Sequence, residues 1–351
     1  MSVLPAAGVI SFARGIPSPD LLPVEQLAEC AGRAANRVSL NYGAPFGYAP
    51  LREWLAERHG VTEERVIVTP GSLIALNFIV AATRGRAIVE APTYDRMLHA
   101  LGDAEVVTVP RDADGVDLDA LAAAITPDTR FLYVLPTFHN PTGRTLTGAQ
   151  RRALADLAIE RGLLVYEDDP YRDVRIDGEP EASLHSLLPD ELCVFTSSFS
   201  KTVAPGLRVG YAVLPPQLVA PVAALATRTY VSPPLLAQAQ LLEFLEAGHL
   251  EPHLAFLGRA LGERRDALLA ELEALRGVAT WTRPGGGYFL WLEQPVSAVA
   301  LLERAQQAGV AFVPGASFGG SAGSARLAFS YASVDEIRVG ARRLAELVRA
   351  G

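Results

Sequence analysis

Short apolar runs alternate with helical patterns through the first two thirds of the chain, and this alternation limits the fold more than any other feature. The runs are rich in β-branched residues and predict strands at 65–69, 87–90, 105–109, 130–135, 163–167, 192–196 and 208–214. Predicted helices between them include 71–83, 117–124 and 147–161. Strands that are apolar almost throughout, with helices between them, are typical of a mainly parallel sheet covered by helices on both faces. We therefore expect an α/β fold.

The pattern changes after Pro233 and Pro234. Helices are predicted at 235–247, 251–275, 296–308 and 334–350, and strands at 287–292 and 326–329. This order is typical of a smaller α+β unit. A chain of 351 residues is long enough for two domains that share a cleft. We expect an N-terminal segment at 1–41 that joins the small domain, a large domain at 42–233 that binds the ligand, and a C-terminal small domain at 234–351.

Charge and cysteine content narrow the class of partner. The net charge of −8 argues against a nucleic acid or an anionic membrane, because both favour a basic face. Cys30 and Cys193 are far apart in apolar contexts, as expected of reduced thiols in the cytosol. No secretory pattern is visible in residues 1–14, and the most apolar segment, 73–82, is too short to span a bilayer. We expect a cytoplasmic protein whose partner is a small molecule or a second copy of itself.

One lysine stands among hydroxyls directly after the strand predicted at 192–196. Ser198 and Ser200 precede Lys201, and Arg208 follows a turn that contains proline and glycine. A lysine that forms a Schiff base with an aldehyde cofactor needs small polar neighbours and a nearby cation. Lys201 is therefore the candidate for that role, although Ser-x-x-Lys by itself is more often a solvated turn.

Polar residues also follow two other predicted strands, at the edge where an open parallel sheet binds its ligands. Gly71 and Ser72 open a helix after the strand at 65–69, so free backbone N–H groups there can bind a phosphate. The same residues would also serve as an ordinary helix cap. Asn140 follows the strand at 130–135 and offers an amide from a loop that prolines make stiff.

Asp168 and Tyr171 follow the strand predicted at 163–167. A carboxylate in this place can face a pyridine nitrogen and keep it protonated, and Tyr171 can hydrogen-bond a phenolic oxygen. The alternatives are a solvated acidic loop or a divalent-metal site. No histidine or helical Glu spacing accompanies the acids, so no metal is expected. With Lys201 and Arg208, these residues describe one ligand, a phosphorylated pyridine aldehyde.

Three spaced motifs carry a resemblance to a known family. They are Asn140-Pro141-Thr142-Gly143, Asp168-Asp169-Pro170-Tyr171 and Ser198-Phe199-Ser200-Lys201, the last followed by Leu207-Arg208-Val209-Gly210-Tyr211. In this order they resemble the signatures of fold-type I pyridoxal-phosphate-dependent aminotransferases of class I/II. The branch that looks most similar contains aminoadipate and kynurenine aminotransferases and the aminotransferase-like domain of MocR-type regulators. The resemblance extends from about residue 10 to residue 330. It implies a cytoplasmic homodimeric transferase of amino acid metabolism and biosynthesis, with pyridoxal 5′-phosphate as cofactor.

The resemblance also implies roles for single residues. Lys201 would hold the cofactor as a Schiff base and move the substrate α-proton, and Asp168 would pair with the ring nitrogen. Further cofactor contacts are implied for Gly71, Ser72, Tyr94, Asn140, Tyr171, Ser198, Ser200, Arg208 and, from the neighbouring subunit, Tyr42. Arg326 would bind the substrate α-carboxylate, with Gly15 and Asn140 assisting. The alternative interpretations, in which neither residue binds a ligand, are that Tyr94 is an ordinary core aromatic and that Arg326 is an exposed arginine at the end of a strand.

The implied reaction is a ping-pong transfer of an amino group from an α-amino acid to a 2-oxo acid, with 2-oxoglutarate as the implied acceptor. A lyase, decarboxylase or oxidase that uses the same cofactor stays open as an alternative, as does a non-catalytic ligand-sensing module. No basic helix-turn-helix precedes Gly15, which disfavours the sensing module. Leu73 stands where relatives often carry glutamine, and Arg14 stands where they often carry glycine. Because of these differences, the resemblance does not identify the amino acid substrate. Tyr288 and Phe318 suggest a pocket that accepts bulky side chains.

Overall fold

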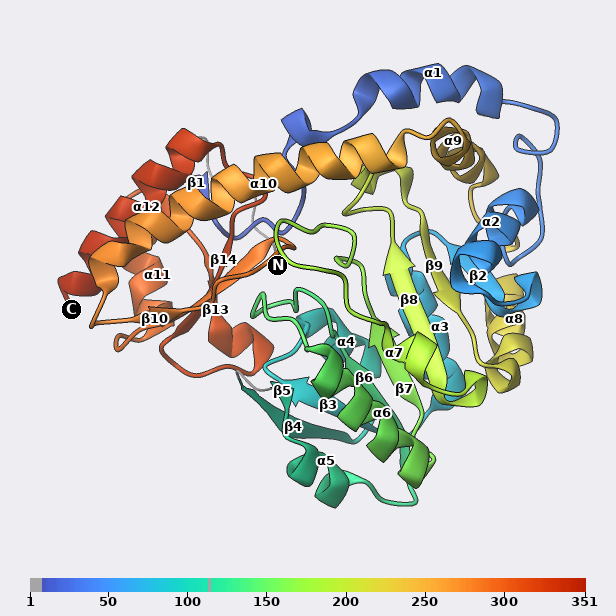
Figure 1. Ribbon diagram of the computed structural model, residues 1–351, viewed down its shortest axis with the longest axis horizontal. Helices are drawn as coiled ribbons and strands as arrows, with labels where there is room; N and C mark the ends of the chain where they lie inside the picture. Colours follow the sequence, from blue (N-terminus) through green and yellow to red (C-terminus); the bar gives the residue numbers. More distant parts are fainter. Residues whose placement is uncertain (1–7, 113–114) are drawn as a thin grey trace.

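An eight-stranded sheet forms the centre of the larger part of the molecule (Figure 1). The computed structural model describes residues 8–112 and 115–351. The order of the strands across the sheet is β2-β9-β8-β7-β6-β3-β4-β5. The strands are β2 (Val66–Thr69), β3 (Arg86–Ala91), β4 (Val106–Asp112), β5 (Gly115–Val116), β6 (Thr129–Val134), β7 (Val165–Asp168), β8 (Cys193–Ser198) and β9 (Gly210–Val213).

The pairing of these strands is mainly parallel, as predicted. Strands β4, β3, β6, β7 and β8, adjacent in this order, are parallel to one another. Strand β9 is antiparallel to both β8 and β2, and β5 is antiparallel to β4. Because β2 and β8 are each antiparallel to β9, they run in the same direction. The carboxyl ends of β2, β6, β7 and β8 therefore lie at one edge of the sheet.

Helices cover both faces of this sheet. Ala87 and Val89 of β3 pack in one apolar cluster with α3, α4 and α8, whereas Ile88 between them packs with α5, α6 and α7 on the other face. This alternation follows from the two-residue period of a strand. A third cluster joins α1, α2 and α9 to β2, β8 and β9. The helices are α1 (Val24–Ala34), α2 (Ala49–His59), α3 (Ser72–Thr83), α4 (Asp95–Leu101), α5 (Leu118–Ala124), α6 (Gly148–Arg161), α7 (Leu184–Leu187), α8 (Pro216–Tyr230) and α9 (Leu235–Glu246).

The smaller part contains a four-stranded antiparallel sheet in the order β10-β11-β14-β13 and a two-stranded parallel pair of β1 with β12. Its elements are β1 (Ile10–Ser11), α10 (Leu250–Leu272), β10 (Thr280–Trp281), β11 (Phe289–Glu293), α11 (Ala298–Gln307), β12 (Val310–Ala311), β13 (Val313–Pro314), β14 (Ser324–Ala328) and α12 (Val334–Arg349). Its apolar core also includes Phe138 and Tyr171, which follow β6 and β7. The two parts therefore share a core beside the carboxyl edge of the large sheet.

The division into 1–41, 42–233 and 234–351 stays a prediction, and the packing adds detail to it. Pairing of β1 with β12 ties the start of the described chain to the smaller part. Helices α1 and α9, from outside 42–233, instead pack on each other and against strands of the large sheet. Figure 1 shows α10 running from beside α9 towards α12.

Several predicted strand boundaries need correction. The strand predicted at 105–109 continues to Asp112 as β4. The strand predicted at 208–214 begins only at Gly210, because a 3-10 turn spans Pro205–Leu207 and Arg208 has a φ of 53°. This left-handed conformation cannot continue a strand. The strand predicted at 163–167 is β7, and it extends one residue further than predicted. Asp168 is therefore its last residue rather than the first residue after it. Within the described part of the chain, no helix is both long and apolar enough to cross a membrane.

Candidate active site

The predicted site residues come from the one edge of the large sheet where β2, β6, β7 and β8 end. Gly71 and Ser72 follow β2, Asn140 lies in the loop after β6, Asp168 ends β7, and Lys201 follows β8. The smaller part contributes β14 and the segment around Gly15, which meet this edge through the contacts described below. The fold therefore assembles residues as far apart in the sequence as Gly15 and Arg326.

Lys201 points its amine towards the N-terminal segment. Its Nζ donates a hydrogen bond to the carbonyl oxygen of Gly15 at 2.8 Å. The Nζ also lies 5.8 Å and 5.6 Å from the ring centroids of Tyr171 and Tyr288, and the Tyr288 hydroxyl donates to the Lys201 carbonyl at 2.7 Å. Burial lowers the pKa of Lys201 to about 8, and the positive charge of Arg326 adds to this shift. A substantial fraction of this amine is therefore neutral near pH 8, and a neutral amine is nucleophilic.

Asp168 is a buried acid whose hydrogen-bond partners are both neutral. The Tyr133 hydroxyl donates to its Oδ2 at 2.7 Å, and Thr196 Oγ1 donates to its Oδ1 at 3.1 Å. Burial raises the pKa of Asp168 to about 6, although the two hydroxyls lower it. A buried carboxylate in this setting gains most from a cationic partner. A protonated pyridine nitrogen would be such a partner.

Arg326 is a buried cation held by neutral groups. Its Nη1 donates to Asn140 Oδ1 at 2.9 Å, and its Nη2 donates to the Ala13 carbonyl at 3.1 Å. The guanidinium carbon lies 4.3 Å and 4.7 Å from the ring centroids of Phe289 and Phe318, and Nε is buried without a hydrogen-bond partner. Burial lowers the pKa of Arg326 to about 10. An arginine in this environment is suited to binding a carboxylate.

Backbone close approaches shape the turn where the phosphate is expected. Gly71 caps α3 with a φ of 87°, and a Cβ there would collide with the guanidinium of Arg208. A Cβ on Gly210 would likewise collide with the backbone of Ser72. Arg208 is exposed, with only long hydrogen bonds to the carbonyls of Pro70 and Pro205. The start of α3 and a guanidinium that is bonded only to uncharged carbonyls thus meet at one place, which suits an anion.

Two serines lie beside this turn. Ser198 and Ser200 are 5% and 8% exposed, and the backbone N–H of Ser200 donates to Ser198 Oγ at 3.1 Å. Ser198 Oγ itself donates to the Val209 carbonyl at 3.3 Å. This bond ties the segment before Lys201 to the segment after Arg208. The two serines are therefore held next to the residues that the sequence predicts to share one phosphate.

Aromatic residues surround the Asp168 end of the site. Tyr171 is 3% exposed and packs edge-on against Tyr288 and Phe289. Tyr94 directly precedes α4, and its pKa is raised by burial and by the negative charge of Asp168. Burial also raises the pKa of Tyr171, with Tyr94 adding to the shift. Both hydroxyls therefore stay protonated and can donate hydrogen bonds.

Three residues do not join this group within the single chain. Tyr42 is 83% exposed in the single chain. Arg14 places its guanidinium carbon 4.5 Å from the ring centroid of Tyr331. Leu73 is 36% exposed on α3.

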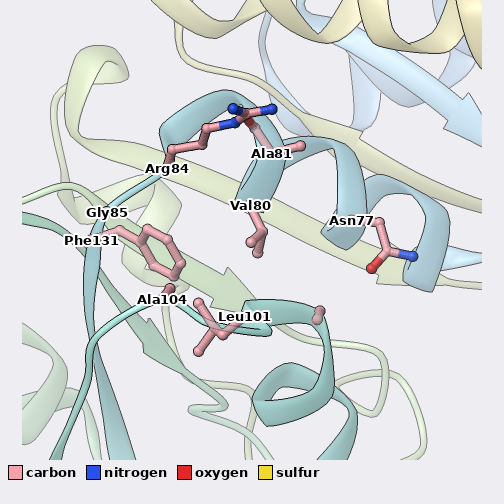
Figure 2. Close-up of a pocket in the computed structure, with 9 residues that line it drawn as sticks. Asn77, Val80, Ala81, Arg84, Gly85, Leu101, Ala104 and Phe131 are labelled. Carbon is pink, nitrogen blue, oxygen red and sulfur yellow. The ribbon is translucent and has the colours of Figure 1, made fainter.

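A separate cavity of about 300 Å³ lies between α3, α4 and β6 (Figure 2). Figure 2 shows that its lining consists mainly of small and apolar residues, with Asn77 and Arg84 as polar members. None of the predicted site residues lines it. Among the described residues, no group of three or more His, Cys, Asp and Glu side chains could hold a metal ion.

Sequence analysis did not identify Tyr133 and Thr196, the two donors to Asp168. The register pairs Thr196 with Asp168 and Tyr133 with Tyr166. Only this register shows that the three polar side chains meet on one face of the sheet. The alternation within each strand was visible in the sequence, but the pairing between strands was not.

Taken together, the chain offers a hydroxyl-rich anion turn, a buried acid, a shielded amine and a buried guanidinium. These groups fit the phosphate, the ring nitrogen, the aldehyde of pyridoxal phosphate and the carboxylate of an amino acid, respectively. The close approach of Gly71 to Arg208, and the charges of Asp168 and Arg326 that lack an ionic hydrogen-bond partner, support this fit.

Comparison with known proteins agrees with the geometry. The profile of the family "Aminotransferase class I and II" matches residues 7–344. A 2-aminoadipate transaminase of Thermus thermophilus is 37% identical, covering 97% of this chain and 90% of its own. An aromatic-amino-acid aminotransferase of Thermococcus litoralis is 32% identical, covering 99% and 90%.

A solved structure is similar over the whole fold. The α-aminoadipate aminotransferase of Thermus thermophilus, complexed with a phosphopyridoxyl-leucine, has a TM-score of 0.92 at 35% identity, covering 98% of this chain and 93% of its own. The chain therefore belongs to the class I and II aminotransferases, and it is a pyridoxal-phosphate-dependent aminotransferase of fold type I.

Proposed function

We propose that the enzyme transfers the amino group of an α-amino acid to 2-oxoglutarate in two half-reactions that share one site. The observation that carries this proposal is a pair of buried charges, Asp168 and Arg326, whose hydrogen-bond partners are neutral. A cationic ring nitrogen and a substrate carboxylate would supply the two missing counter-charges. Amino acids and 2-oxo acids both carry that carboxylate, so one arginine can serve both half-reactions.

Lys201 is the proposed Schiff-base residue and proton carrier. Bound pyridoxal phosphate supplies an aldehyde that accepts the amino group and a protonated ring that withdraws electrons from the substrate Cα. With the cofactor bound, the Lys201 amine would accept the proton from the substrate Cα and would later give it back as a general acid. Burial favours the neutral, basic form of Lys201 that this task needs.

The other residues position the cofactor. Asp168 is proposed to hold the ring nitrogen in its protonated form, and Tyr94 to stack on the ring. Asn140 and Tyr171 are proposed to donate to the ring hydroxyl oxygen. The proposed phosphate site consists of Gly71, Ser72, Ser198, Ser200 and Arg208.

Arg326 is the proposed carboxylate ligand at the substrate end. The Gly15 carbonyl, which accepts from Lys201 Nζ, places the N-terminal segment beside the same site. The hydrogen bond between Asn140 and Arg326 connects the substrate end with the cofactor end. A misplaced substrate carboxylate would therefore also disturb a cofactor contact.

We further propose a homodimer in which Tyr42 reaches the phosphate of the neighbouring subunit. Exposed apolar side chains support an interface here, since Val38, Leu40 and Tyr42 are 63%, 67% and 83% exposed. The backbone N–H of Gly43 donates to Ser232 Oγ, so this segment lies against the chain just before α9. Interaction surfaces expose contiguous apolar side chains on the monomer.

The decisive experiment combines adduct mapping with a donor screen. Borohydride treatment of the enzyme loaded with pyridoxal phosphate should trap a phosphopyridoxyl group on Lys201, identified by peptide mass spectrometry, and Lys201→Ala should show none. Each amino donor is then incubated with 2-oxoglutarate, and glutamate and the new oxo acid are measured. Aminoadipate, aromatic and branched donors come first. Release of carbon dioxide or ammonia, or uptake of oxygen, in place of glutamate would assign the reaction to a decarboxylase, a lyase or an oxidase.

A further inference from the structure

The carboxylate of Asp168 accepts hydrogen bonds from two hydroxyls on neighbouring strands, and neither belongs to the family motifs noted in the sequence. Tyr133 and Thr196 are both fully buried, and Asp168 is 5% exposed. The Tyr133 bond is the shorter one, 2.7 Å to Oδ2 against 3.1 Å from Thr196 to Oδ1. Each carboxylate oxygen thus has one fixed neutral donor and keeps a lone pair for another partner.

The strand register explains this arrangement. Thr196 of β8 lies directly opposite Asp168, whereas Tyr133 of β6 lies opposite Tyr166, two residues before Asp168 on β7. Asp168 and Tyr133 are therefore diagonal neighbours on one face of the sheet. A long aromatic side chain can cover such a diagonal, and a shorter side chain cannot. The Tyr133 ring also packs edge-on against Tyr166, with centroids 5.4 Å apart, which fixes its direction.

The titratable groups near Asp168 whose pKa its negative charge raises are uncharged hydroxyls. Besides Tyr133, they are the phenols of Tyr94, Tyr166 and Tyr171. Burial raises the pKa of Asp168 to about 6, and only the bonds from Tyr133 and Thr196 act in the opposite direction. Hydrogen bonds to the charged form of an acid favour that form.

We propose that Tyr133, together with Thr196, is a positioning residue for Asp168. The two hydroxyls hold the carboxylate in its anionic form and orient it towards the ring nitrogen of the cofactor, and so they strengthen its pairing with that protonated nitrogen. The inference rests on the proposed pairing of Asp168 with that nitrogen. It assigns to Tyr133 an effect on one atom of the cofactor, whereas a purely structural residue would affect every ligand of the site alike.

The test compares two ligands on the apoprotein. One is pyridoxal phosphate, and the other is its deaza analogue, in which C–H replaces the ring nitrogen. Dissociation constants are measured by fluorescence titration for the wild type, Tyr133→Phe, Thr196→Val and Tyr166→Phe. Tyr166→Phe is the control, because it removes a buried hydroxyl from the same face of the sheet that does not donate to Asp168. Since a hydrogen bond to a charged group is lost, Tyr133→Phe should weaken binding of pyridoxal phosphate by about tenfold or more. Its affinity for the deaza analogue should stay unchanged.

Each outcome decides one claim. Equal weakening of both ligands by Tyr133→Phe, or an equally large effect of Tyr166→Phe, would overturn the positioning role. If Tyr133→Phe does not fold, Thr196→Val decides by the same comparison of the two ligands. A wild type that binds both ligands equally well would instead refute the pairing of Asp168 with the ring nitrogen. That result would count against the proposed function separately from the role of Tyr133.

Discussion

Arg326 and Asn140 are joined by a hydrogen bond of 2.9 Å between Nη1 and Oδ1, although they lie in different parts of the fold. Arg326 belongs to β14 of the small sheet, and Asn140 lies in the loop after β6 of the large sheet. The bond fixes the guanidinium without neutralising it, because an amide oxygen carries no net charge. The guanidinium therefore keeps its net positive charge.

Replacing Arg326 should therefore weaken carboxylate binding far more than cofactor binding. Removal of one partner from a buried charge pair costs about 2–5 kcal/mol, so we expect Arg326→Gln to lower kcat/KM for amino acids by roughly a hundredfold, mainly through KM. Steady-state kinetics with a good amino donor would measure this. The control substrate is the matching amine without the carboxylate, whose reaction should hardly change. A similar loss with both substrates would contradict the role.

The acidity of Lys201 gives a second prediction. Burial and then Arg326 lower its pKa to about 8, and only the deprotonated amine attacks an aldehyde. The rate at which apoprotein captures pyridoxal phosphate should rise with pH through a midpoint near pH 8. Arg326→Gln removes a nearby positive charge, so the midpoint should move to higher pH. Stopped-flow absorbance of Schiff-base formation would show both effects, and a wild-type midpoint near that of free lysine would refute them.

The raised pKa of Asp168 leads to a third prediction, which concerns cofactor affinity. Burial raises this pKa to about 6, so in the apoprotein the carboxyl is neutral below that pH and anionic above it. Its contribution to binding a cationic ring should be present above pH 6 and lost as the pH falls through it. The cofactor phosphate titrates in the same range, so Asp168→Asn serves as reference. The affinity ratio of wild type to Asp168→Asn, from fluorescence titration, should shrink towards one at low pH. A ratio that does not change with pH would contradict the assignment.

Local pattern was sufficient to predict most of the fold. Apolar runs marked β2, β3, β6, β7 and β8 to within two residues at each end and β4 to within three, because buried parallel strands need apolar side chains on both faces. The carboxyl ends of these strands then located Asn140, Asp168 and Lys201, since in a parallel sheet those ends share an edge. The sequence motifs and the strand topology thus predicted the same place for the cofactor site.

Features that depend on pairing between distant segments could not be predicted. Tyr133 meets Asp168 only because β6 and β7 pair in one register. The left-handed backbone of Arg208 follows from its position between a 3-10 turn and β9, and an arginine carries no local preference for that conformation. The attachment of α1 and α9 to the large sheet likewise arises from tertiary packing.

The turn at Gly71 offers a test of the phosphate site with a neighbouring control. Gly71 has a φ of 87° and a Cβ there would meet Arg208, so Gly71→Ala should strain the turn and displace the guanidinium. Gly206, two residues before Arg208, has open space around its position and no positive φ. We expect Gly71→Ala to weaken binding of pyridoxal phosphate by about tenfold or more but leave pyridoxal, which lacks the phosphate, unaffected. Gly206→Ala should change neither, and a loss with both ligands would indicate general damage.

The exposed Tyr42 allows a test of shared sites by mixing subunits. If Tyr42 completes the site of the neighbouring subunit, Tyr42→Ala and Lys201→Ala should each be impaired alone. A hybrid dimer would then contain one site with both residues intact, because each subunit supplies what the other lacks. Random reassociation of equal amounts should recover about a quarter of wild-type activity, since half of the dimers are hybrids and each has one working site. The measurement is activity at limiting pyridoxal phosphate after denaturation and joint refolding, with separately refolded variants as control. Failure of mixing to restore activity, with dimers present by light scattering, would place Tyr42 outside the partner's site.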